Sequence, residues 1–146
     1  MGMMFKTGQK LFVDTAPLIY WFEENPVYTS KMKSFFDEIT TKHILLITSM
    51  VTYIEVLTYP EKQGARELVS SYREYLLDSE QIRIHPLDVS VADAAVRLRC
   101  LYSLRTPDAI QLATAQTCDC DFVLSNDKTW KKVAGMRVLL VQELGL

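Results

Sequence analysis

The chain has few of the residues that mark several common protein classes. Its 146 residues include only five glycines and three cysteines, and its formal net charge is −2. Neither a P-loop nor a G-x-G-x-x-G dinucleotide motif is present. The longest uncharged apolar stretch, residues 44–54, is shorter than the roughly 20 residues that a membrane-spanning helix needs. The first ten residues also lack the apolar core of a signal peptide. We therefore expect a cytoplasmic protein that does not contact a membrane.

The cysteines exclude a disulfide framework and a zinc site. They are odd in number, and Cys118 and Cys120 have a C-x-C spacing with no second pair to complete four ligands. We expect these two and Cys100 to be small buried or half-buried apolar residues.

The composition is that of a folded globular protein. Apolar residues make up 49% of the chain and charged residues 23%, and a chain of this length can bury a substantial core. No repeat or linker-like tract divides it, so we expect a single domain over residues 1–146.

Strand-like and helix-like segments alternate along the chain. Strands are predicted at 10–14, 43–48, 81–85, 121–124 and 137–141. Helices are predicted at 15–24, around the apolar spacing of 32–39, at 49–59 ending before Pro60, at 62–78, at 88–102, and from 106 with Thr106 as N-cap. This alternation predicts a three-layer α/β/α sandwich with a mostly parallel sheet of about five strands.

Four acidic residues lie where a predicted strand gives way to a helix, or on the helix that follows: Asp14, Glu55, Asp108 and Asp127. Ligands of parallel α/β sheets bind outside the carboxyl ends of the strands, so these acids are expected to meet at one edge. Clustered carboxylates repel one another unless a divalent cation neutralises them. The pattern therefore predicts a Mg²⁺ or Mn²⁺ site.

Each of these acids also has a structural interpretation. Asp14, Asp108 and Asp127 could cap a helix or favour its first turn. Glu55 differs because it is the only charge between His43 and Pro60, so we expect it to be buried and to need a metal or a basic partner. Basic residues near Asp108 and Asp127, among them Arg105 and Lys128, could contact phosphates or form a solvated surface.

Four segments carry a family resemblance: FVDTAPLIYWF, TYIEVL, RTPDAIQLATA and DFVLSNDKTW. In this order they resemble the acidic motifs of the PIN-domain nucleases. The resemblance implies a metal-dependent endoribonuclease, often the VapC-like toxin of a toxin–antitoxin pair, with RNA as substrate and an antitoxin protein as partner. It carries the catalytic and metal-binding roles to Asp14, Glu55, Asp108 and Asp127, and it makes Thr15 and Ser125 candidate substrate-binding neighbours.

We expect Asp14 and Asp108 to bind the metal directly, and Glu55 and Asp127 to hold waters or a second ion. Phosphatases and receiver domains also begin with a strand followed by Asp. They need a second acid near that Asp, whereas Asp14 is followed by Thr15-Ala16. The remaining alternative is a catalytically silent PIN-like module that binds RNA or serves as a scaffold.

The first predicted helix is apolar on every side, from Pro17 to Phe22. We expect another chain to cover part of this surface, either a second copy in a homodimer or an antitoxin segment. A central, buried position within its own chain is the alternative.

Overall fold

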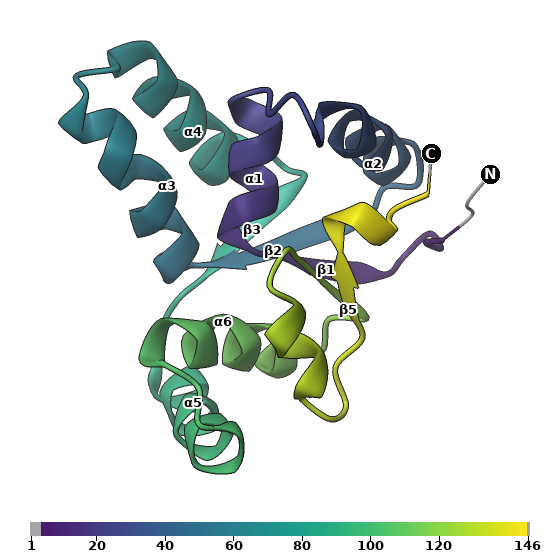
Figure 1. The fold of residues 1–146 in the computed structure, drawn as a ribbon, viewed down its shortest axis with the longest axis vertical. Coiled ribbons are helices and arrows are strands. Elements are labelled where there is room, and N and C mark those ends of the chain that lie inside the picture. The colour runs from purple at the N-terminus through teal and green to yellow at the C-terminus, as the bar shows by residue number, and fades with distance from the viewer. Residues whose placement is uncertain (1–3, 146) are drawn as a thin grey trace.

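The computed structural model describes residues 4–145, and its centre is a five-stranded sheet (Figure 1). The strands are β1 (Lys10–Val13), β2 (Leu45–Ser49), β3 (Ile82–His85), β4 (Phe122–Ser125) and β5 (Val138–Leu140). The helices are α1 (Thr15–Phe22), α2 (Thr29–Thr41), α3 (Met50–Lys62), α4 (Arg66–Asp78), α5 (Val89–Tyr102) and α6 (Thr106–Thr117), with 3-10 helices η1 (Lys128–Lys132) and η2 (Val141–Glu143). The predicted α/β class is confirmed, and each strand lies within two residues of its predicted position.

The sheet is parallel throughout, with the strand order β3-β2-β1-β4-β5. Helices α1 to α4 lie on one face of it, and α5 and α6 lie on the other (Figure 1). Because side chains alternate along a strand, Leu11 and Val13 of β1 join the core under α1–α4, whereas Phe12 joins the core under α5 and α6. Both faces of the sheet are therefore buried, as expected for parallel strands.

Helix α1 is packed by its own chain. Trp21 stacks on Phe36 of α2 with ring centroids 3.7 Å apart, and Phe22 stacks on Tyr72 of α4 at 4.4 Å. Leu18 is fully buried. The apolar surface that led us to expect a covering chain is thus largely accounted for by α2, α3 and α4, which pack around it (Figure 1).

The predicted end of α3 before Pro60 is wrong, since the helix continues to Lys62. Proline tolerates helical φ, and its carbonyl can still accept a hydrogen bond. Here the Pro60 carbonyl accepts the N–H of Ala65 at 3.0 Å, and the buried Pro60 ring packs inside the protein. The chain turns instead at Gly64, whose φ of +68° favours glycine, so the next helix begins at Arg66 and not at 62.

Two further expectations are corrected. The N-cap of α6 is Arg105, which makes no side-chain capping bond, while Thr106 and Pro107 are its first two helical residues. Cys100 is exposed, although Cys118 and Cys120 are half-buried as expected. Within residues 4–145, no helix is long and apolar enough to cross a membrane.

Candidate active site

The order of the strands reverses beside β1, which has β2 and β3 on one side and β4 and β5 on the other. Such a switch point, at the carboxyl ends of the strands, is the usual ligand site of an open parallel sheet. Asp14 follows β1 directly, and its backbone N–H donates to the Leu124 carbonyl of β4 at 2.9 Å. Asp14 therefore lies at the switch point.

Three donors hold the Asp14 carboxylate in one orientation. Its Oδ1 accepts the backbone N–H of Thr15 at 2.7 Å and the Nε2 of Gln111 at 2.8 Å. Its Oδ2 accepts the hydroxyl of Ser125 at 2.7 Å. Asp14 is also the N-cap of α1.

Burial raises the pKa of Asp14 from 3.8 to about 6. Desolvation is the largest cause, because the charged form loses its hydration. The bonds from Ser125, Thr15 and Gln111 oppose this shift, and the negative charge of Glu55 adds to it. This carboxylate is costly to ionise, and hydrogen-bond donors fix its orientation. A positive charge bound beside it would offset the cost of ionisation.

Gln111 is a positioning residue that the sequence reasoning missed. It is 2% exposed, and its Nε2 also donates to the Thr52 hydroxyl at 2.9 Å. Its Oε1 accepts the hydroxyl of Ser49, the N-cap residue of α3. The sequence feature that could have indicated it is an amide side chain between Ile110 and Leu112, one turn after Asp108, on a mostly apolar helix.

A cleft of about 570 Å³ opens above Asp14, between α1, α3 and the start of α6. Its lining includes three of the four predicted acids, Asp14, Glu55 and Asp108. Glu55 is exposed and not buried as expected, because it lies on the face of α3 that borders the cleft. Its Oε1 accepts the hydroxyl of Thr15 at 2.6 Å, so Thr15 connects the Glu55 and Asp14 sites.

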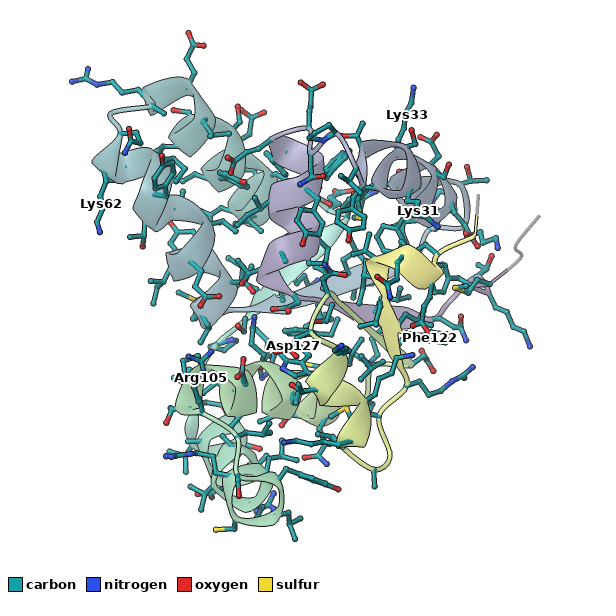
Figure 2. The ribbon with its side chains drawn as sticks, viewed as in Figure 1. Lys31, Lys33, Lys62, Arg105, Phe122 and Asp127 are labelled. Atoms are coloured by element: carbon teal, nitrogen blue, oxygen red, sulfur yellow. The ribbon has the colours of Figure 1, made fainter. Side chains whose placement is uncertain are left out.

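Asp108 lies in the first turn of α6, where the helix dipole favours a negative charge. Its Oδ2 is 3.6 Å from the Nε of Arg105, whose side chain is 83% exposed and projects from the start of the helix (Figure 2). Arg105 is therefore free to contact a bound molecule at the edge of the cleft.

Arg105 and the remaining predicted residues lie outside the cleft lining. Asp127 is the N-cap of η1, where its Oδ1 accepts the N–H and the hydroxyl of Thr129 at 3.0 and 2.6 Å. Lys128 is exposed on the following turn. Ser125 is fully buried, so it holds Asp14 and has no surface on which to contact a substrate.

The family model of the PIN domain matches residues 11–136. The chain belongs to the PIN domain family. This match runs from β1 through η1, ends before β5, and contains all four predicted acids. No curated protein sequence matches the chain.

Solved structures with this fold include several toxin–antitoxin proteins. A toxin–antitoxin complex from Klebsiella pneumoniae is 25% identical, with 90% of this chain and 97% of that chain covered and a TM-score of 0.60. VapBC2 from Rickettsia felis bound to a promoter DNA fragment is 12% identical, with 90% and 98% covered and a TM-score of 0.74. Mycobacterium tuberculosis VapC20, a sarcin–ricin loop cleaving toxin, is 14% identical, with 87% and 98% covered and a TM-score of 0.67.

PIN-family nucleases generally use divalent metals, and the donor set of this PIN domain suits a hydrated one. Within residues 4–145, no group of three His, Cys, Asp or Glu side chains is arranged to hold an ion alone. Mg²⁺, however, needs only one or two carboxylates and keeps several waters. The desolvated Asp14 carboxylate, with Asp108 and Glu55 lining the same cleft, supplies hard oxygen ligands of that kind.

Proposed function

We propose that this PIN domain is a Mg²⁺- or Mn²⁺-dependent endoribonuclease that hydrolyses RNA phosphodiester bonds. The observation that carries the proposal is the Asp14 carboxylate. It is desolvated, fixed by Ser125 and Gln111, and faces a cleft that it shares with Glu55 and Asp108. This arrangement has the charge of a cation site and the access that a polymeric substrate needs. A cytoplasmic location is consistent with an RNA substrate.

Each residue of the cleft then has a role. Asp14 and Asp108 would bind the ion, which when bound lowers the pKa of water and neutralises charge on a phosphate. Glu55 is exposed beside them and can orient a water molecule or accept its proton. Arg105, at the edge of the cleft, can contact a phosphate oxygen.

We assign Asp127 and Lys128 lesser parts. The backbone N–H of Asp127 donates to the Ser125 hydroxyl at 3.0 Å, and Ser125 donates to Asp14. This chain of bonds makes Asp127 a support for the orientation of Asp14, through its backbone. Lys128 follows on the exposed turn, where it can contact phosphate farther from the acids.

The toxin of a toxin–antitoxin pair is the biological role that we infer. The Klebsiella structure, 25% identical over nearly its whole chain, is a toxin–antitoxin complex. An antitoxin protein is therefore the expected partner. A catalytically silent PIN-like module is the competing function, but the presence of Asp14, Glu55 and Asp108 around one cleft favours catalysis.

The decisive experiment is RNA cleavage by the purified protein with Mn²⁺, with Mg²⁺ and with EDTA. We expect cleavage only with a metal, and a loss of at least about a hundredfold in Asp14→Asn, because it removes a metal ligand. Mn²⁺ should also raise the melting temperature of the parent more than that of Asp14→Asn, since a ligand that binds only the folded state stabilises it. The matched control is Asp37→Asn, an exposed carboxylate on α2. Cleavage that persists in EDTA would refute the metal mechanism.

A further inference from the structure

One face of α3 continues the cleft away from the acids. Glu55, Tyr59 and Lys62 are spaced by four and three residues, so they lie along the same side of the helix. All three line the cleft together with Asp14 and Asp108. Seven residues of helix span about 10 Å, which places Lys62 beyond the reacting groups.

Tyr59 is unusual among the tyrosines of this chain. The other six each have a hydrogen-bond or ring-stacking partner: Tyr20, Tyr28, Tyr53, Tyr72, Tyr75 and Tyr102. Tyr59 is 65% exposed, and its side chain takes part in no hydrogen bond or aromatic pair within residues 4–145, although its backbone carbonyl accepts the N–H of Gln63. Its ring is therefore available to a bound molecule at the cleft.

Lys62 is also free of a partner within the described chain. Lys42, Lys131 and Lys31 are engaged by Glu38, by Glu143 and by backbone carbonyls, whereas Lys33 and Lys128 are free like Lys62 among the described residues but do not line the cleft. Lys62 projects from the end of α3, on the same side of the molecule as Arg105 at the start of α6 (Figure 2). Lys62 lines the cleft, whose centre is acidic, and Arg105 lies just outside its lining, 3.6 Å from Asp108. This charge distribution suits a polyanion whose central phosphate meets a metal and whose flanking phosphates meet cations.

We propose that Tyr59 and Lys62 form a nucleotide subsite, in which Tyr59 stacks on an unpaired base and Lys62 contacts a neighbouring phosphate. The proposal rests on the proposed ribonuclease function and adds a preference to it. A protruding aromatic ring can stack only on a base that is not paired within a helix, so binding favours single-stranded RNA or a loop. The alternative occupant is a protein segment that covers Ile54 and Tyr59, which are both exposed. The experiment distinguishes this alternative from a nucleotide.

The test is binding of a fluorescein-labelled single-stranded RNA, and of the same sequence in a duplex, measured by anisotropy. The Asp14→Asn background with Mn²⁺ prevents cleavage during the titration. Stacking on an aromatic side chain contributes roughly a fivefold or greater change in affinity per base. Tyr59→Leu should therefore weaken single-strand binding at least about fivefold and leave duplex binding unchanged. Tyr59→Phe, which keeps the ring, should stay within about twofold of its parent.

Salt dependence tests Lys62 separately. Each phosphate contact on a single strand contributes about 0.7 to the slope of log K against log salt. Lys62→Gln should lower the slope by about this amount, and Lys62→Arg should retain it. The control is Lys33→Gln, an exposed lysine of α2 away from the cleft (Figure 2), which should change neither quantity.

The outcomes separate this inference from the proposed function. If the unmodified protein cleaves RNA, but Tyr59→Leu and Lys62→Gln bind RNA as tightly as the Asp14→Asn protein from which they are made, the subsite is refuted while the ribonuclease stands. Equal losses on single strand and duplex would refute stacking. If the parent does not cleave RNA, yet single-strand binding depends on Tyr59 and Lys62, the subsite stands and the catalytic proposal fails.

Discussion

Ionisation of Asp14 at the bottom of the cleft costs free energy, because burial removes the hydration of the carboxylate. Its folded pKa, about 6, lies above the unfolded value of 3.8. The metal-free protein should therefore lose stability as the pH rises through 3.8 to about 6, and regain it on acidification. The shift corresponds to about 2–3 kcal/mol at pH 7. We expect Asp14→Asn to melt about 2–8 °C above the parent in EDTA at pH 7.5, with little difference at pH 4.

Asp108→Asn is the matched comparison at this scale. Asp108 is close to Arg105 and in the first turn of α6, two features that favour its charge. Its replacement should leave the melting temperature in EDTA at or slightly below that of the parent. Thermal melting by circular dichroism distinguishes the two variants. If Asp14→Asn melted well below the parent, the hydrogen bonds and helix cap of the Asp14 carboxylate would contribute more to stability than its desolvation costs.

At the scale of the elements, α1 is held by aromatic stacking. Trp21 stacks on Phe36 and also meets the edge of Tyr75 of α4, at 5.4 Å between centroids. Trp21→Ala should lower the unfolding free energy by about 3 kcal/mol, the lower end for aromatic truncations, because Trp21 is partly exposed. Urea denaturation measures this loss of unfolding free energy. The control is Val27→Ala, at a side chain that is 74% exposed, and it should change the unfolding free energy little. A loss below about 1 kcal/mol would show that α1 contributes little to the core.

At the scale of the whole molecule, several of the exposed large apolar side chains lie on α5, others lie on α3 and α4, and none lies on α1 within the described residues. Val89, Val96 and Leu101 are 76%, 60% and 74% exposed. Val89 and Val96 are seven residues apart, so they lie on the same side of α5. Exposed apolar surface marks interaction sites, and we predict that the protein forms a homodimer through this side of α5. Val96→Glu should convert a dimer to a monomer in light scattering, whereas Lys33→Gln should not. A parent protein that is monomeric at micromolar concentration would contradict the prediction.

Much of the fold was predictable because its signals are local. The apolar runs of β2 and β4 and the Asp88 N-cap of α5 depend on a few neighbouring residues. The end of α3 was not predictable in this way. Proline ends many helices, but Pro60 is buried, and its carbonyl accepts a hydrogen bond from the N–H of Ala65, beyond Gly64.

The α/β class and the family could be read from the amino-acid sequence, and four candidate acids could be predicted from it, since periodicity and motifs are properties of short segments. Only the tertiary structure decided which side chains meet. It brought Gln111 and Ser125 to Asp14 from 97 and 111 residues away, left Glu55 exposed on the cleft, and made Asp127 the cap of η1. Hydrogen bonds and desolvation depend on distance in space. A segment's own sequence therefore does not reveal whether its carboxylate will be buried, solvated or used as a helix cap.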